Sequence, residues 1–260
     1  MLRPRIIPCL LVRNGGLVKT VCFDKSKYVG DPINAVRIFN EKEVDELIVA
    51  DIDATVHNRE PNYGMIRNLA NECRMPLCYA GGVQTAEQIE RIVSLGVEKV
   101  AMSEAAVNTP QVINEAAKRV GSQSVVVVID VKKAGLLRRY EVFTHNGTKA
   151  TGLDPVAFAR KVESLGAGEV VINAISHDGE MKGYDLDLIS AVRAAINLPL
   201  TVLGGAGSLE DIEKLIRTFG IIGAAAGSLF VFKGKYRAVL INYPNRSEKE
   251  ALLTRATQFA

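Results

Sequence analysis

Short apolar runs alternate with amphipathic segments along the whole chain. Eight of these runs have strand character, namely Arg5–Val12, Glu46–Asp51, Pro76–Ala80, Lys99–Met102, Val125–Val131, Glu169–Ala174, Pro199–Leu203 and Ile221–Ala226. Most are separated by segments of helical periodicity, such as Ala86–Leu95 and Leu209–Phe219. Continuous apolar strands that alternate with helices predict a parallel sheet covered by helices. Eight such units in 260 residues predict an α/β fold, a single (β/α)8 TIM barrel, because a doubly wound sheet usually has fewer strands or a second domain.

An internal repeat supports this interpretation. The segment MPLCYAGGVQTAEQIERI from Met75 matches LPLTVLGGAGSLEDIEKL from Leu198 at an offset of 123 residues, and the same offset separates Glu46 from Glu169. The second and third strands therefore resemble the sixth and seventh. We expect one domain over residues 1–260, built from two half-barrels of approximately 1–121 and 122–260.

Composition and charge narrow the function classes. The chain is 48% hydrophobic and 23% charged, which excludes a disordered chain. Its 32 basic and 29 acidic residues leave a net charge of +3, and no run of Lys or Arg exceeds two residues. We therefore expect no nucleic-acid or membrane partner, and favour a small charged metabolite or a protein partner.

The amino terminus and the cysteines bear on the compartment. The opening MLRPRIIPCLLV is too short to span a bilayer, is broken by Pro8 and lacks a signal-peptide cleavage site. The cysteines show no C-x-x-C spacing and are too few for a disulfide scaffold; they are Cys9, Cys22, Cys73 and Cys78. These features predict a reducing, cytoplasmic location.

Glycine-rich turns after the seventh and eighth strands predict an anion site. In a TIM barrel the active site lies at the carboxyl ends of the strands, and phosphates often bind to backbone amides after strands seven and eight. Gly205 and Gly207 follow strand seven, and Gly227 and Ser228 follow strand eight. Gly179, after strand six, could complete the rim, although each of these glycines is also explained by a tight turn. The repeat places a second candidate at Gly81-Gly82 and Ser103-Glu104, where the Glu104 carboxylate would repel a phosphate.

Asp130 ends strand five, where the acid–base groups of barrels project. The alternative is a surface carboxylate paired with Lys132 or Lys133. Leu11 stands where a second carboxylate is expected across the barrel, at the top of strand one. No carboxylate pair is therefore predicted.

Four charged residues begin strands at the opposite end of the barrel. They are Arg5, Glu46, Lys99 and Glu169. Ring closure would bring two cations and two anions together at the floor. They could form a plug of ion pairs or a polar passage for a small neutral molecule, and the residues alone leave both open.

The three histidines give no metal-ligand pattern. His57, His145 and His177 lie at unrelated spacings, without a cysteine or carboxylate cluster. We predict no metal and no cofactor.

Several motifs together resemble the cyclase subunit of imidazole glycerol phosphate synthase along nearly the whole chain. They are RIIPCLLVRNGGLVK, VDELIVADIDAT, AGGVQ, EKVAMSEAAV, SQSVVVVIDVKK, Thr151-Gly152, DGEMKGYD and LGGAG. In that family a glutaminase docks on the bottom of the barrel. Its ammonia crosses to the top and closes an imidazole ring on a two-phosphate ribonucleotide from histidine biosynthesis.

The resemblance assigns roles to residues at both ends of the barrel. The family's ammonia gate corresponds to Arg5, Glu46, Lys99 and Glu169, which favours the passage over the plug. The acid of the glutaminase-docking face corresponds to Glu98, and the lysine of the mobile loop after strand one corresponds to Lys19. One phosphate site corresponds to Gly179, Gly205 and Ser228, and the strand-five catalytic aspartate to Asp130.

Departures from the family pattern concentrate at the top. The strand-one catalytic aspartate falls on Leu11, which can neither accept nor donate a proton. The Asn-Thr of the other phosphate site falls on Ser103-Glu104, and polar positions on strands six and seven fall on Ser176 and Leu203. Loss of a positioned acid–base group typically costs about 10²–10⁴ in rate.

This pattern is similar to a paralogous branch encoded with surface-polysaccharide genes. The resemblance implies an ammonia-conducting subunit that works with a glutaminase and a separate sugar amidotransferase in lipopolysaccharide O-antigen biosynthesis. The alternative is an authentic cyclase-lyase of histidine biosynthesis that uses Asp130 with a substitute for the missing acid.

Overall fold

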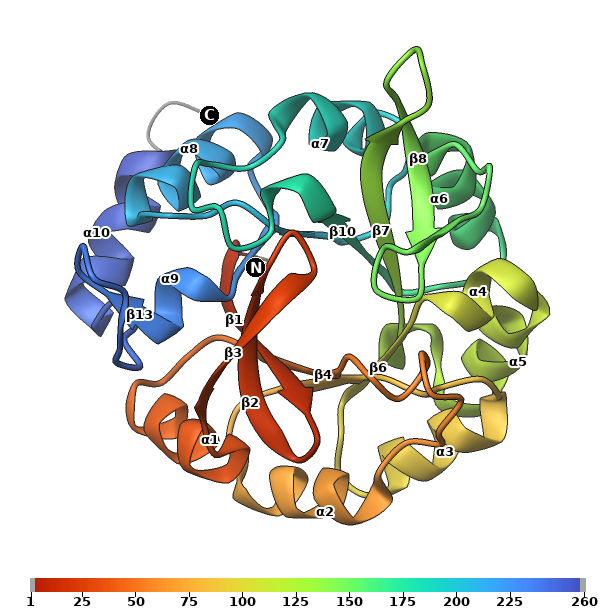
Figure 1. Ribbon diagram of the computed structural model, residues 1–260, viewed down its shortest axis with the longest axis horizontal. Coiled ribbons are helices and arrows are strands. Elements are labelled where there is room, and N and C mark those ends of the chain that lie inside the picture. Colours follow the sequence, from red (N-terminus) through yellow and green to blue (C-terminus); the bar gives the residue numbers. More distant parts are fainter. Residues whose placement is uncertain (1–2, 258–260) are drawn as a thin grey trace.

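Eight parallel strands close into a barrel at the centre of the computed structural model, which describes residues 3–257 (Figure 1). In chain order these are β1 (Arg5–Arg13), β4 (Leu47–Asp51), β5 (Leu77–Ala80), β6 (Lys99–Met102), β7 (Val125–Ala134), β10 (Glu169–Ala174), β11 (Leu200–Leu203) and β12 (Gly223–Ala226). Each strand pairs in parallel with the next, and β12 pairs with β1 through Arg5 and Gly223. The predicted TIM barrel is confirmed.

An outer ring of helices covers the strands (Figure 1). The ring comprises α1 (Pro32–Glu41), α2 (Tyr63–Glu72), α3 (Ala86–Ser94), α5 (Gln111–Val120), α6 (Pro155–Ser164), α7 (Leu186–Arg193), α8 (Leu209–Phe219) and α10 (Arg246–Thr257), with the short helices α4 (Glu104–Asn108) and α9 (Ser228–Val231). Thr85 before α3 and Ser208 before α8 each form a capping box, which satisfies amides of the first helical turn. These two caps are also 123 positions apart. None of the helices described is long and apolar enough to cross a bilayer.

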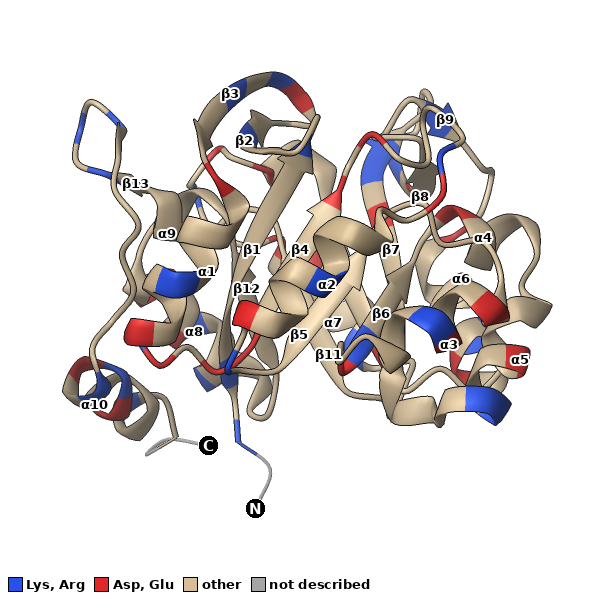
Figure 2. Ribbon diagram, turned by 90° about the horizontal axis from the view of Figure 1, so that it is seen from below, with Lys and Arg blue, Asp and Glu red and all other residues tan. Residues whose placement is uncertain are grey.

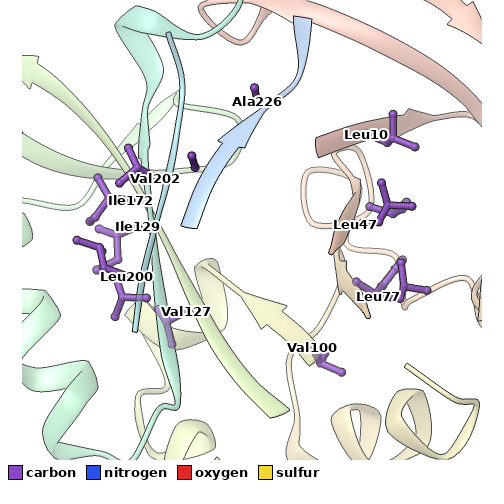
Figure 3. Close-up of a cluster of buried hydrophobic side chains, with 14 of the residues drawn as sticks. Leu10, Leu47, Leu77, Val100, Val127, Ile129, Ile172, Leu200, Val202 and Ala226 are labelled. Carbon is purple, nitrogen blue, oxygen red and sulfur yellow. The ribbon is translucent and has the colours of Figure 1, made fainter. Parts of the chain in front are cut away.

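The strands carry two apolar layers, because successive side chains point to opposite faces. Outward-facing residues such as Leu10, Leu47 and Ile172 pack against the helices (Figure 3). Inward-facing residues form a separate cluster, here called the apolar interior: Ile7, Cys9, Ile48, Cys78, Ala101, Val126, Val171 and Ala225. The barrel is therefore lined along its axis by small and medium apolar side chains.

Three antiparallel hairpins stand at the carboxyl end of the barrel (Figure 2). β1 continues into β2 (Gly16–Val21) and β3 (Asp24–Gly30), and β7 continues into β8 (Arg139–Thr144) and β9 (Lys149–Ala150). The third pairs β13 (Phe232–Lys233) with β14 (Ala238–Val239). The sequence pattern predicted none of these hairpins.

A buried carboxylate joins the two ends of the described chain at the floor. Asp45 accepts from the backbone amide of Ile6 at 2.9 Å and from Lys249 Nζ at 2.8 Å. Tyr243 donates its hydroxyl to the Ile6 carbonyl at 2.9 Å. Helix α10 is thereby held against the start of β1.

Candidate functional site

A cavity opens at the carboxyl ends of the barrel strands, where a TIM barrel places its chemistry. Its volume is about 170 Å³. Four apolar side chains line it where it meets the apolar interior: Leu11, Ala80, Val128 and Leu203. Part of the apolar interior, further apolar residues and several polar side chains line the rest, and together they make this top cavity the candidate site.

Asp130 lies in the top cavity, near the end of the part of β7 that pairs in parallel within the barrel and where β7 begins its hairpin with β8. Its Oδ1 accepts from Asn173 Nδ2 at 2.9 Å, and Ser103 Oγ lies 3.5 Å from its Oδ2. Burial raises the pKa of Asp130 to about 7, although the hydrogen bonds from Asn173 and Ser103 oppose the shift. A carboxyl group that titrates near neutrality can hold or release a proton under ordinary conditions. The expected position of Asp130 at the top of strand five is confirmed, and its chemical role stays a prediction.

Lys19 lies in β2 and points into the barrel, so the segment expected as a loop is a hairpin in this structure. Its side chain is buried, and its Nζ donates to the Cys9 carbonyl. Burial lowers the pKa of Lys19, and the Asp178 carboxylate partly offsets this effect. The hairpin therefore places a cation between the candidate anion site and the apolar interior.

The residues of the expected anion site come together on one side of the cavity. Gly179, Gly205, Gly227 and Ser228 all line it. Gly205 has a φ of +115°, and a side chain there would clash with the Gly183 carbonyl, so the turn after β11 requires glycine.

Gly207 differs from this group. Its backbone amide donates to Asp211 at 2.9 Å as part of the N-terminal cap of α8, and it does not line the cavity. In this geometry Gly207 offers no free donor to an anion. The sequence showed only its place in a glycine-rich turn, which gives no information about the partner of its amide.

Arg237 is a contributor that the sequence analysis missed. Its guanidinium lies 3.4 Å from Ser228 Oγ and 3.3 Å from the Gly179 carbonyl. It comes from the turn between β13 and β14, nine positions after Ser228, in a segment without a recognisable motif. The anion site therefore has two nearby cations, Lys19 and Arg237.

The second anion candidate has a different character. Ser103 and Glu104 line the opposite side of the cavity, and the Gly82 amide lies 3.4 Å from Thr55 Oγ1. Glu104 accepts a hydrogen bond from Asn108, four residues later in α4. The cavity therefore has a carboxylate at this position, which disfavours a bound phosphate.

The four charges at the floor form a closed charge ring, defined as Arg5, Glu46, Lys99 and Glu169. Lys99 Nζ lies 2.9 Å from Glu46 and 2.8 Å from Glu169, and Arg5 pairs with both carboxylates, at 2.7 Å for Glu169. Each charge thus has two partners of opposite sign. Thr201, which the sequence analysis did not single out, donates its hydroxyl to Glu169.

The ring favours the charged forms of Glu169 and Lys99. Burial alone would raise the pKa of Glu169, but Arg5 and Lys99 outweigh it, so the pKa is lowered. Burial would likewise lower the pKa of Lys99, but Glu169 and Glu46 outweigh it, so the pKa is raised. The predicted convergence of these four residues is confirmed, whereas their role as a gate stays a prediction.

The charge ring also faces outward, into a depression on the bottom of the barrel. Arg5, Lys99 and Glu169 line this depression together with residues of the strand-connecting loops. Glu98 lies on the same face and accepts from the Leu77 amide at 2.8 Å. A partner that covered the depression would contact the ring directly.

Within residues 3–257 no group of three His, Cys, Asp or Glu side chains is arranged to hold a metal ion. His145 lines the top cavity, and His177 contacts the Gly183 carbonyl at 3.0 Å. Neither histidine converges on a carboxylate and cysteine cluster.

Comparison with known proteins agrees with this arrangement. The family model described as "Histidine biosynthesis protein" matches residues 5–237. The chain is 57% identical to the "Putative imidazole glycerol phosphate synthase subunit HisF" of Leptospira interrogans, over 97% of this chain and 99% of that protein. It is 57% identical to the subunit named hisF3 of Vibrio vulnificus, over 97% of each chain. It is 51% identical to the subunit named hisF2 of Pseudomonas aeruginosa, over 94% of this chain and 97% of that protein.

The range matched by the family model, residues 5–237, contains the charge ring, Asp130 and the glycines of the anion site. The chain therefore belongs to the histidine biosynthesis protein family, among the HisF-type cyclase subunits of imidazole glycerol phosphate synthase.

Proposed function

We propose that this protein is the ammonia-conducting subunit of a glutamine amidotransferase complex. A glutaminase docks on the bottom of the barrel, and ammonia passes the charge ring and the apolar interior to the top cavity. The observation that carries this proposal is the complete charge ring beneath an apolar interior. Charged residues at the entrance bind the partner and order it, while apolar walls offer a small neutral molecule no competing hydrogen bonds.

The top cavity supports an acceptor other than the two-phosphate ribonucleotide. Leu11 provides no proton-transfer group opposite Asp130, and Glu104 adds a negative charge where a second phosphate would bind. The anion site near Gly179 and Ser228 remains suited to one phosphate group. We propose that the conducted ammonia serves a separate enzyme that amidates a nucleotide sugar of O-antigen biosynthesis.

The exposed face above the cavity suits such a partner. Segments 24–28, 132–139 and 233–237, at the turns of the three hairpins, contain nine basic residues and one acidic residue, although the whole chain has a net charge of only +3. Large apolar side chains are exposed at the same turns, with Leu136 fully exposed and Tyr236 91% exposed. Figure 2 shows these hairpins at the same end of the barrel. This combination favours an acidic protein surface or an anionic sugar nucleotide.

Reconstitution with the glutaminase encoded nearest to this gene tests the proposal. We expect the two proteins to co-purify. Adding the barrel to the glutaminase should stimulate glutamine hydrolysis until the two proteins reach a fixed molar ratio, beyond which more barrel has no further effect. Ala101→Leu, which fills the apolar interior, should keep the stimulation but reduce amidation of the acceptor. No co-purification and no stimulation would overturn the proposal.

An authentic cyclase is the second candidate, and one observation favours it. Asp130 is half-buried, has a pKa raised to about 7 and faces Asn173, as an acid–base group would. Expression in a histidine auxotroph that lacks its own cyclase separates the two candidates. We expect no growth without histidine from a well-expressed, folded protein, and growth would establish the cyclase.

A further inference from the structure

Asn173 has a side-chain oxygen without a hydrogen-bond partner. Among the described residues, only Asn173 Oδ1 and the Tyr79 hydroxyl are buried without one. Tyr79 belongs to the outer core between strands and helices, whereas Asn173 lines the top cavity. Asn173 is 6% exposed. A buried amide oxygen without a partner is unfavourable, and a ligand with an N–H or O–H group would remove that penalty.

The neighbouring carboxylate determines which way this amide points. Asn173 Nδ2 donates to Asp130 Oδ1 at 2.9 Å, so the amide nitrogen faces the carboxylate. The flipped amide would place Oδ1 against the negative charge of Asp130, which is unfavourable when that group is ionised. Asn173 Oδ1 therefore keeps its full capacity to accept a hydrogen bond.

Asp130 also retains accepting capacity. Its Oδ2 has Ser103 Oγ at 3.5 Å, which is long for a hydrogen bond between oxygens. The structure gives Asp130 no ion pair with a described Lys, Arg or His. Lys19, the buried cation of the cavity, is already bound to the Cys9 carbonyl. The end of the apolar interior thus has a half-buried carboxylate without a counter-ion among the described residues.

We propose that Asn173 Oδ1, Asp130 Oδ2 and Ser103 Oγ bind one ammonium ion at the upper end of the apolar interior. The proposal rests on the conducting function described above. The amide oxygen of Asn173 accepts hydrogen bonds and donates none. The carboxylate of Asp130 does the same when it is ionised, and the hydroxyl of Ser103 can also accept. A small cation with several N–H donors therefore suits the site, and an anion does not.

The same residues provide a way to retain arriving ammonia. Neutral ammonia that meets the protonated carboxyl group of Asp130 takes its proton, giving ammonium and the carboxylate. The bond broken is O–H and the bond formed is N–H, and no other reactant is needed. The raised pKa of Asp130 keeps part of the carboxyl groups protonated at neutral pH. The ion would wait beside the cavity until the acceptor arrives.

Crystals of the barrel alone, soaked in thallium(I) acetate, test the site. Thallous ion resembles ammonium in charge and size and is located by its anomalous scattering. We expect one peak among the three oxygens, displaced by excess ammonium. Asn173→Leu, which keeps the number of side-chain heavy atoms and the branching at Cγ, and Asp130→Asn should each lower its occupancy at least tenfold. Asn146→Gly is the matched control, because Asn146 also lines the cavity but donates to the Ile52 carbonyl, and its φ of +53° suits glycine.

The other outcomes overturn the proposal. They are the absence of a peak in the unsubstituted protein, a peak that ammonium does not displace, or an unchanged peak in Asn173→Leu, which would indicate an adventitious ion only. Should Asn173→Leu not fold, Ser103→Ala provides the same comparison with a milder change. Stimulation of the glutaminase is measured separately on the same proteins. A barrel that stimulates the glutaminase but binds no thallous ion would refute this site alone. A barrel that binds the ion but does not stimulate the glutaminase would refute the conducting function.

Discussion

The hydroxyl of Thr20 donates to the carboxylate of Asp178 at 2.6 Å, although the two residues are 158 positions apart. The same carboxylate accepts from the Phe23 amide at 3.3 Å, and the Cys22 amide donates to the Asp178 carbonyl at 2.9 Å. These contacts hold the β2–β3 hairpin against the segment that follows β10. They also determine where Lys19 enters the cavity.

Thr20→Val should loosen this hairpin without changing the barrel. The substitution preserves side-chain shape but removes one hydrogen bond to a carboxylate, typically about 1.5–3 kcal/mol. We expect amide hydrogen exchange in residues 22–28 to rise at least tenfold, while the barrel strands stay protected. Thr148→Ala is the control, because Thr148 lies between β8 and β9, in a different hairpin, and donates to the His145 carbonyl there. Unchanged exchange would mean that the backbone contacts alone hold the hairpin.

Asp130 should make the stability of the protein depend on pH. Burial raises its pKa to about 7 in the folded protein, whereas the unfolded chain has the ordinary value of about 4. Between these values the folded state binds more protons, so this contribution is complete below about pH 4 and is lost as the pH rises through 7. We expect urea unfolding to show a loss on the order of a few kcal/mol across that window, and Asp130→Asn to remove it. Equal pH profiles would place the pKa near its ordinary value.

Lys99→Met should lower the free energy of unfolding by an amount that depends on pH, because it removes one cation of the charge ring. It leaves Glu46 and Glu169 with Arg5 as the remaining cation of the ring, and breaking a buried pair typically costs about 3–5 kcal/mol. We expect that loss in urea unfolding at pH 8 and a smaller one at pH 5, where a carboxylate without its partner takes up a proton. Arg119→Met is the matched control. Arg119 pairs with Glu87 and Glu90 on the surface, where ion pairs contribute about 0–1 kcal/mol.

Leu11→Asp should not restore cyclase activity by itself. The new carboxylate would face Asp130 across the cavity, but Glu104 would still repel the second phosphate of the substrate. We expect measurable turnover only when Ser103→Asn and Glu104→Thr are added. The assay is formation of imidazole glycerol phosphate with ammonium as the nitrogen source. Activity in the single variant would show that Leu11 alone accounts for the loss.

Sulfate should bind on one side of the top cavity. We expect an ion beside Gly179, Gly205 and Ser228 in crystals grown with sulfate, and none beside Ser103 and Glu104. Arg237→Met should lower the occupancy, because Arg237 lies 3.4 Å from Ser228 Oγ. Glu104→Gln, which removes the repelling charge, tests the empty side. Sulfate only at Ser103 and Glu104 would contradict the assignment.

The strands and several helices could be predicted from the sequence because their signals are local. Apolar runs identified β1 through Arg5–Val12, one residue short of its observed end, and periodicity identified α8 at Leu209–Phe219. Ring closure then followed from the number of strand–helix units. It brought Arg5, Glu46, Lys99 and Glu169 together, since each begins a strand of the same barrel or immediately precedes one.

The finer structure of the site could not be predicted because it depends on side-chain direction and long-range contacts. Arg237 reaches Ser228 from a turn without a recognisable motif, and Thr201 is an ordinary strand residue until its partner Glu169 is known. Asn173 stands out only because its side-chain oxygen has no hydrogen-bond partner, which the sequence does not show. The amide of Gly207 was expected to face an anion, but Asp211 occupies it.

The Asp45 contacts and the β1–β12 pairing also bear on the order of folding during synthesis. Strand β1 leaves the ribosome first, yet residues 5–8 pair with residues 223–226, and Asp45 binds Lys249. One edge of β1 therefore has no native partner until nearly the whole chain has been translated. Unpaired strand edges promote association with other chains. The nascent protein is consequently most vulnerable to aggregation just before residues 223–226 appear, so slow translation or truncation in that region should harm it more than changes near β1.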